Sequence, residues 1–346
     1  MSGLTVFFRV DASLTIGVGH VMRCLTLSDE LLGRGIKVVF ICTELEVNLI
    51  QLIKNRGIEV HAIVKNILPV DYEQTKNVLN TYESQYKVLI IDSYIHDIEW
   101  ETLIKRHVDL LISIDDNPRF HNVDILIDNN YKAETVTFYK ENLLETKKLL
   151  GSFYVLLRSE FINYQAHVIN KEFLIHVFFG GADYNNYTYF YSEKILEYKN
   201  FKVHAVVSNS FSYVDTLKEL KSQYGDSFEY SISPKNMAEI MEKCTIALGA
   251  PGTTTWERMA MGLPCAYLAT NNNQIPILQE IQSDKLGIYL GKASKEMSSE
   301  QIQSFLKFVE NVNLQNEIAK NGKQLIDGQG SKRITDFIIN TLRGSY

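Results

Sequence analysis

Short apolar runs alternate with amphipathic segments along the chain, and this alternation constrains the possible folds more than any other feature of the sequence. The first series of runs occupies residues 5–10, 37–42, 58–63, 87–92, 110–114 and 125–128. Within each run the apolar residues are mostly continuous, which is typical of strands buried on both faces of a parallel sheet. Between the runs, apolar residues recur at helical spacing. The first part of the chain therefore predicts a doubly wound α/β domain with right-handed crossovers.

A second series of the same kind follows a stretch, residues 132–159, in which charged residues and helix formers dominate. Its apolar runs occupy residues 173–179, 201–207, 228–232, 245–248, 265–268 and 287–290. A chain of 346 residues is also long for a single core. We therefore predict two Rossmann-like domains, 1–160 and 161–346, and expect the last helix, about residues 332–342, to pack back on the first domain. Tandem domains of this type bind ligands in the cleft between them, at the carboxyl ends of the strands.

The overall composition argues against several classes of partner. The formal net charge is −6 and the acidic residues are dispersed, so we expect neither a nucleic acid nor a membrane surface as partner. The four cysteines lie far apart and form no CxxC pair, which argues against disulfides and against a zinc site. The N-terminus lacks the layout of a signal peptide, and no apolar run reaches about 18 residues. We expect a cytoplasmic, monomeric protein.

The first candidate site is a turn, Gly17-Val18-Gly19-His20, that links the first strand to the first helix. The pattern GxGxxG is not completed, because Met22 and Arg23 follow, and this argues against a nicotinamide cofactor. Glycines allow a sharp turn and a close approach of the backbone to a ligand. The positive end of the helix disfavours an imidazolium ion, so His20 suits a neutral base that activates water. The alternative is a histidine that merely faces solvent in the first helical turn.

Other polar residues of the first domain also follow predicted strands. Asp11 is either a turn former or a contact to a substrate in the cleft. Asp92 could cap a turn, and Tyr94 could either pack or present its hydroxyl to the cleft. Asp115 and Asp116 are interpreted as turn formers or as a polar contact near the cleft. No third ligand has suitable spacing beside them, so we predict no metal site.

Two turns of the second domain could hold phosphate oxygens. Gly180 and Gly181 are expected to open its first helix and to offer backbone amides to a diphosphate. The second turn is more specific, because a strand runs into a Gly/Thr-rich segment and then into a helix, at Gly252, Thr253, Thr254 and Thr255. Glu257, one turn into that helix, either stabilises the helix or accepts from ribose hydroxyls. The amides of Asn273 and Gln274 suit sugar hydroxyls or acetamido groups.

Several of these segments together resemble a known family. The motifs are GVGHVMRCLTL, IDSY, IDDNPRFHNVDILIDNN, GSFYVLLRSEF, FFGGADYNN and GAPGTTTWERMAMGLP, in this order. They resemble the sugar-nucleotide hydrolases of pseudaminic acid biosynthesis, which remove UDP from UDP-2,4-diacetamido-2,4,6-trideoxy-β-L-altrose, and the related spore-coat polysaccharide proteins. The resemblance runs from about residue 5 to residue 274, and its glycine–histidine and TTTWE blocks are together specific.

The resemblance implies a GT-B fold and a metal-independent hydrolase that needs no cofactor and takes a UDP-sugar substrate. It places His20 on the family's proposed catalytic histidine, Tyr94 on a substrate-contacting tyrosine and Glu257 on the acidic residue that holds the ribose of UDP. Asn272 stands where the family usually has aspartate, although Asn273 and Gln274 match, so the exact sugar stays open. The implied mechanism is a single displacement by water, with inversion at the anomeric carbon.

Two other functions are compatible with the same motifs. A UDP-sugar glycosyltransferase similar to the one that makes lipid II shares the fold and a comparable glycine-rich loop with a glutamate. Such an enzyme normally carries a membrane-docking patch on its first domain, and the sequence contains no such segment. A non-catalytic sugar-nucleotide sensor would bind the same ligand without turnover and would not need His20.

Overall fold

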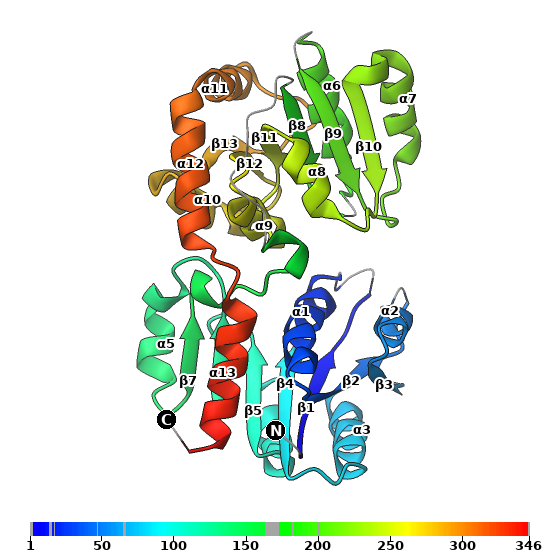
Figure 1. The fold of residues 1–346 in the computed structure, drawn as a ribbon, viewed down its shortest axis with the longest axis vertical. Coiled ribbons are helices and arrows are strands. Elements are labelled where there is room, and N and C mark those ends of the chain that lie inside the picture. The colour runs from blue at the N-terminus through cyan, green and yellow to red at the C-terminus, as the bar shows by residue number, and fades with distance from the viewer. Residues whose placement is uncertain are drawn as a thin grey trace. The chain divides into compact units, whose positions relative to one another are not determined.

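The computed structural model describes residues 3–13, 16, 18–46, 48–64, 67–162, 173–181, 183–198 and 201–344. The chain divides into two compact units (Figure 1). The first unit comprises Met1–Arg158 together with Gly328–Tyr346, and the second comprises Ser159–Asp327. The last helix thus belongs to the same unit as the N-terminus.

The first unit is built on a parallel sheet with the strand order β3-β2-β1-β4-β5-β6-β7. Its strands are β1 (Leu4–Val10), β2 (Lys37–Thr43), β3 (Glu59–Ile63), β4 (Tyr86–Asp92), β5 (Leu110–Ile114), β6 (Ile125–Asp128) and β7 (Lys147–Leu150). β1 is an interior strand between β2 and β4, and all of its residues are buried because helices cover both faces. β7 was not expected from the sequence, because the segment KKLL is short and half charged.

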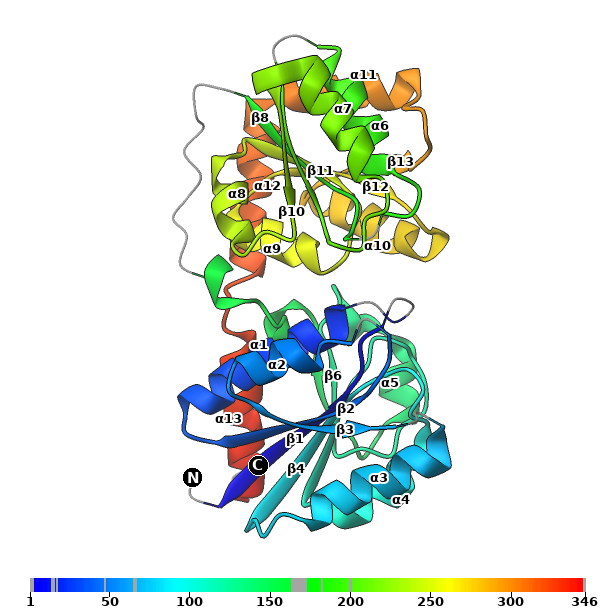
Figure 2. The same cartoon turned by 90° about the vertical axis from the view of Figure 1, so that its right-hand side faces the viewer.

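Helices cover both faces of this sheet (Figure 2). They are α1 (Gly19–Gly33), α2 (Ile50–Asn55), α3 (Leu68–Asn80), α4 (Ile98–Ile104), α5 (Thr137–Asn142) and α13 (Gly330–Leu342). Neighbouring residues of β1 point to opposite faces, so Phe8 joins the core that contains α1 and α13, and Phe7 joins the core that contains α4. Ile334 and Ile338 of α13 are fully buried in the first of these cores. Their burial anchors the end of the chain to the first unit.

The second unit repeats the arrangement with the strand order β10-β9-β8-β11-β12-β13. Its strands are β8 (Leu174–Phe178), β9 (Lys202–Val207), β10 (Phe228–Ile232), β11 (Ile246–Gly249), β12 (Cys265–Ala269) and β13 (Ile288–Lys292). Its helices are α6 (Tyr187–Leu196), α7 (Val214–Tyr224), α8 (Met237–Lys243), α9 (Thr253–Met261), α10 (Ile275–Ser283), α11 (Ser299–Glu310) and α12 (Val312–Leu325). Short 3-10 turns in the two units span Lys105–His107, Ala133–Thr135, Ser152–Tyr154, Ser159–Phe161, Gly225–Ser227 and Asn272–Gln274.

Each sheet has a point at which the order of its strands reverses. In the first unit this point lies between β1 and β4, and in the second between β8 and β11. Open α/β sheets bind ligands beside such a point, at the carboxyl ends of the strands, because the loops on either side diverge there. Among the described helices none is long and apolar enough to cross a membrane.

Candidate functional site

The polar side chains of the first unit gather at its reversal point around Asp92. His20 lies in the first turn of α1, and Asp92 is the last residue of β4 and pairs with Val10 of β1 in register. The Nδ1 atom of His20 lies 2.5 Å from Oδ1 of Asp92. Arg23, one turn further along α1, donates from Nε to Oδ2 of Asp92 and from Nη2 to Oδ1, both at 2.5 Å. A bidentate arginine therefore fixes the carboxylate that contacts the histidine.

This arrangement determines the ionisation of Asp92 and the tautomer of His20. Burial opposes ionisation of Asp92, but the charge of Arg23 and the hydrogen bonds from Arg23 and His20 outweigh it and lower the pKa of Asp92 below its ordinary value. An ionised carboxylate only accepts hydrogen bonds, so the proton of neutral His20 is assigned to Nδ1. The lone pair of the ring then lies on Nε2. A histidine oriented by a carboxylate in this way can accept a proton from a reactant.

Tyr94 borders His20 in the loop after β4. The two rings meet edge to face with centroids 5.0 Å apart, and 48% of Tyr94 is exposed. Its hydroxyl donates to Oδ1 of Asp116 at 2.7 Å. Burial and this hydrogen bond raise the pKa of Tyr94, so it is a neutral hydroxyl at neutral pH rather than a base.

Two other aspartates that the sequence singles out in the first unit have structural partners. Asp115 is buried, and it accepts from the backbone of Asn117 at 2.8 Å and from Nε of Arg119 at 2.6 Å. Asp11 is also buried, with its oxygens 2.7 and 2.9 Å from the guanidinium of Arg9. The backbone amide of Thr43 donates to the same carboxylate at 2.6 Å. These contacts hold the carboxylate of Asp11 within the first unit, and its contact with a substrate stays a prediction.

The described residues contain no group of three or more His, Cys, Asp and Glu side chains arranged to hold a metal ion. Gly19 is the first residue of α1, and a Cβ atom there would meet no other described residue within 4 Å, its own helix and chain neighbours aside. The described residues thus leave space beside the start of α1. Gly17 lies outside the described residues.

In the second unit, the start of α9 is open. Gly252 precedes the helix with a φ of +150°, which favours glycine, and no side chain caps the helix among the described residues. Gly252 and Thr253 are exposed and Thr254 is half-buried, so the first amides of α9 can bind an anion. Thr255 differs, because it is buried and its hydroxyl accepts from the amide of Gly252 at 3.2 Å.

The turn after β8 does not open a helix directly, contrary to the sequence-based expectation. Gly180 and Gly181 follow β8, whereas α6 begins only at Tyr187. Asp183 caps that helix, with Oδ1 3.0 Å from the amide of Tyr187 and Oδ2 2.6 Å from the amide of Thr188. The α6 terminus therefore already carries a carboxylate. In this turn, the predicted phosphate contacts are thus reduced to the loop amides of the two glycines.

The other predicted residues of the second unit lie on α9 and after β12. Glu257 is buried, with 5% of its surface exposed. Asn273 is exposed in the 3-10 turn Asn272–Gln274. Gln274 folds back, and its Oε1 accepts from the amide of Thr270 at 2.9 Å. Of the two side chains, Asn273 is exposed and Gln274 is half-buried.

Sequence reasoning missed Arg23 as part of the site. Its spacing of three residues from His20 on a helix was the available signal, because residues three apart lie on one face.

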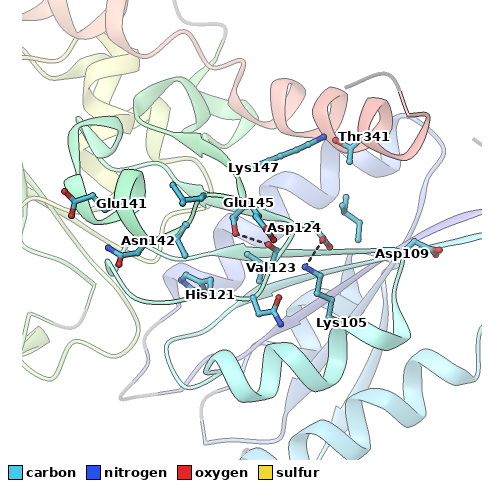
Figure 3. Close-up of a pocket in the computed structure, with 15 residues that line it drawn as sticks. Lys105, Asp109, His121, Val123, Asp124, Glu141, Asn142, Glu145, Lys147 and Thr341 are labelled. Atoms are coloured by element: carbon cyan, nitrogen blue, oxygen red, sulfur yellow. Dashed lines mark hydrogen bonds and ion pairs between the residues drawn. The ribbon is translucent and has the colours of Figure 1, made fainter.

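A further cavity of about 580 Å³ lies at the amino ends of β5, β6 and β7, away from the carboxyl ends that carry the site (Figure 3). It is lined by charged residues that include Lys105 and Asp124, which are paired at 2.8 Å. None of the predicted site residues lines it.

No protein-family model matches the chain. An uncharacterized protein of Methanocaldococcus jannaschii is 28% identical over 298 residues, which is 82% of this chain but only 58% of that protein. The chain thus spans little more than half the length of this relative. A UDP-2,4-diacetamido-2,4,6-trideoxy-β-L-altropyranose hydrolase of Campylobacter jejuni is 26% identical over 243 residues, which is 69% of this chain and 82% of that enzyme.

Solved structures with the same fold cover nearly the whole chain. MurG of Acinetobacter baumannii matches with a TM-score of 0.70 at 10% identity, over 97% of this chain and 99% of its own. The calicheamicin glycosyltransferase matches with a TM-score of 0.70 at 12% identity, over 99% and 98%. The UDP-GlcNAc 2-epimerase of Neisseria meningitidis matches with a TM-score of 0.66 at 12% identity, over 97% and 99%. These likenesses confirm the predicted α/β class with two Rossmann-like domains, known as GT-B.

Proposed function

We propose that the protein hydrolyses a UDP-linked diacetamido-trideoxy hexose and releases UDP and the free sugar, for the synthesis of a nonulosonic acid such as pseudaminic acid or of a related surface polysaccharide. The observation that carries the proposal is the contact of His20 with Asp92 at the reversal point of the first sheet. It provides an oriented base of the kind that water activation needs. The similarity to the Campylobacter hydrolase supports this choice of reaction and substrate.

In the proposed reaction, Nε2 of His20 takes a proton from a water molecule as the water oxygen attacks the anomeric carbon. The bond between that carbon and the diphosphate oxygen breaks, and UDP leaves with the bonding electrons. Asp92 holds the ring through Nδ1 and stabilises the imidazolium that forms. One displacement inverts the anomeric centre. Tyr94, half-exposed beside His20, would contact the sugar through its ring or hydroxyl.

We assign the nucleotide to the second unit. The exposed start of α9, at Gly252, Thr253 and Thr254, would bind the diphosphate through amides and hydroxyls and stabilise its charge as it leaves. The loop amides of Gly180 and Gly181 would add to this site. Glu257 would accept from the ribose hydroxyls, and Asn273 would contact an acetamido group of the sugar.

A glycosyltransferase is the second candidate, because two of the solved structures that share the fold are MurG and a glycosyltransferase, each with a TM-score of 0.70. In that case a sugar acceptor would take the place of water, and His20 would deprotonate its hydroxyl. A sensor that binds UDP-sugar without turnover is the third candidate. Of the three, only the hydrolase would release UDP without an acceptor.

The test is to incubate the protein with UDP-diacetamido-trideoxy sugars of the altro and gluco series and to follow UDP release without any acceptor. The experiment is repeated after exhaustive EDTA treatment, and in ¹⁸O water to show which bond breaks. We expect turnover of one series, unaffected by EDTA, with no ¹⁸O in the released UDP, because water attacks the anomeric carbon and not the phosphorus. Tight binding without UDP release would contradict the hydrolase and favour one of the other two functions. Loss of turnover in EDTA that magnesium restores would contradict the metal-independent mechanism.

A further inference from the structure

Arg258 is a fully buried cation at the base of the two turns that we assign to the diphosphate. It lies on α9, and none of its surface is exposed. Its Nη1 donates to the carbonyl of Ala250 at 3.3 Å, and its Nη2 donates to the carbonyl of Phe178 at 3.2 Å. Phe178 ends β8 and Ala250 follows β11, so one guanidinium joins the two strands that flank the reversal point of the second sheet.

No carboxylate among the described residues contacts this charge. The polar contacts of Arg258 go to the two carbonyls and to the Sγ of Cys265, and its Cζ lies 5.8 Å from the centroid of the Tyr267 ring. Within the described part of the chain, its buried Nε has no hydrogen-bond partner. The nearby His176 cannot help, because burial and the charge of Arg258 hold its pKa well below the ordinary value and keep it neutral. A buried charge without a counter-charge is costly, so its presence calls for an explanation.

The position of Arg258 supplies that explanation. Phe178 directly precedes the segment Phe179-Gly180-Gly181, and Ala250 directly precedes Pro251-Gly252 at the start of α9. We propose that Arg258 is the fixed positive charge for a nucleoside diphosphate bound at these turns, acting through the protein without touching the ligand. The inference rests on the proposed nucleotide site of the second unit. The diphosphate would provide a negative charge for a guanidinium that no carboxylate of the described residues contacts.

The size of the effect follows from Coulomb's law. Two unit charges about 10 Å apart in a medium with an effective dielectric constant of about 20 change a binding constant roughly tenfold. A buried charge is little screened by salt, so the effect should persist at moderate ionic strength. Uridine carries no phosphate, and its affinity should not depend on the charge of Arg258.

The experiment compares Arg258→Gln and Arg258→Lys with the wild type by calorimetric titration of UDP, UMP and uridine, with thermal unfolding of each free protein as a check of folding. We expect Arg258→Gln to weaken UDP binding about tenfold, to weaken UMP binding less and to leave uridine binding unchanged, while Arg258→Lys keeps part of the UDP affinity. Arg258→Met, which is also neutral, is the second variant should Arg258→Gln not fold.

The outcomes separate this inference from the proposed function. If the wild type binds UDP and the neutral variants bind it equally well, the role of Arg258 is wrong and the nucleotide site stands. If UDP and uridine weaken by the same factor, Arg258 only holds the two turns in shape, which also overturns the inference. If the wild type binds no UDP, both the nucleotide assignment and the inference fail.

Discussion

At the scale of single residues, two neighbours hold His20 in place. The sequence argument relied only on the start of a helix. The structure adds Asp92, whose Oδ1 lies 2.5 Å from Nδ1 of the ring, and Arg23, whose Nη2 lies 3.2 Å from the same atom. The carboxylate orients the ring, and the arginine fixes the carboxylate. The contact with Asp92 had to be seen in three dimensions, because Asp92 lies 72 residues from His20 along the chain.

Replacing His20 by asparagine should lower kcat by about 10²–10⁴-fold, since positioned general-base catalysis typically contributes this much. UDP affinity should hardly change, because we assign the nucleotide to the other unit. The measurements are kcat at a fixed pH and UDP affinity by calorimetric titration. The control is His107→Asn, a histidine in the turn before β5 and outside the site. A near-normal kcat in His20→Asn would make His20 structural.

Replacing Arg23 by methionine should lower kcat, because the bidentate contact that holds Asp92 beside His20 is lost. Arg23→Lys keeps the charge but not the bidentate contact, and should lie between the variant and the wild type. The measurement is kcat at a fixed pH, with the melting temperature of each free protein as a check of folding. A normal kcat in Arg23→Met would contradict the positioning role, and a loss of kcat that only follows a loss of stability would show that Arg23 merely supports the fold.

At the scale of elements, the strands and helices of both units could largely be predicted, because long apolar runs and helical periodicity report burial directly. Two local features could not. β7 is a short edge strand with two lysines, so its sequence lacks an apolar run. The start of α6 was placed too early, because the glycines after β8 resemble a helix-opening turn. Asp183, which caps Tyr187 and Thr188, was the signal that was overlooked.

The start of α1 leads to a prediction about Gly19. A Cβ atom there would meet no atom of another described element within 4 Å, and alanine is a better helix former than glycine. Gly19→Ala should therefore leave the melting temperature unchanged or slightly raised, yet lower kcat/KM if the substrate lies against this turn. Gly33→Ala is the matched control, since it ends the same helix and its Cβ would also meet nothing within 4 Å. Equal activity of both variants would contradict a close approach of the substrate at Gly19.

At the scale of the whole molecule, each unit carries one of the two tryptophans, Trp100 in α4 and Trp256 in α9. Variants with a single tryptophan can therefore report the unfolding of each unit separately. The two-domain class was predictable from the two series of strands. The arrangement of the domains about a common cleft stays a prediction, because it depends on contacts that no local pattern of the sequence encodes.

The first unit should lose stability in acid through Asp71. Burial opposes its ionisation, but the hydrogen bond from His96 and the charge and hydrogen bonds of Arg9 outweigh it and lower the pKa of Asp71 to about 2. In the unfolded chain the pKa of Asp71 is 3.8, so its lowered pKa in the folded state stabilises the fold at pH values above 3.8. This contribution is lost as the pH falls from 3.8 through about 2. The shift corresponds to about 2 kcal/mol. The free energy of unfolding, measured by the fluorescence of Trp100 in the Trp256→Phe variant, should fall between about pH 4 and pH 2. Adding Asp71→Asn should flatten it, and an unchanged slope would contradict the assignment.

UDP should stabilise the second unit more than the first. A ligand that binds only the folded state stabilises it by about 2.7 kcal/mol at 100 times its Kd. Trp256 lies beside Glu257 on α9, so its fluorescence in a Trp100→Phe variant should report both UDP binding and a raised unfolding midpoint. The midpoint reported by Trp100 in Trp256→Phe should rise less, because the nucleotide contacts assigned above all lie in the second unit.

Glu257→Ala should reduce the rise caused by UDP, because it removes the acceptor for the ribose hydroxyls. It should also reduce the rise caused by uridine, whereas Arg258→Gln should leave the binding of uridine unchanged. If millimolar UDP moved neither midpoint, or moved the Trp100 midpoint more, the nucleotide would have to be sought outside α9 and the turn after β8.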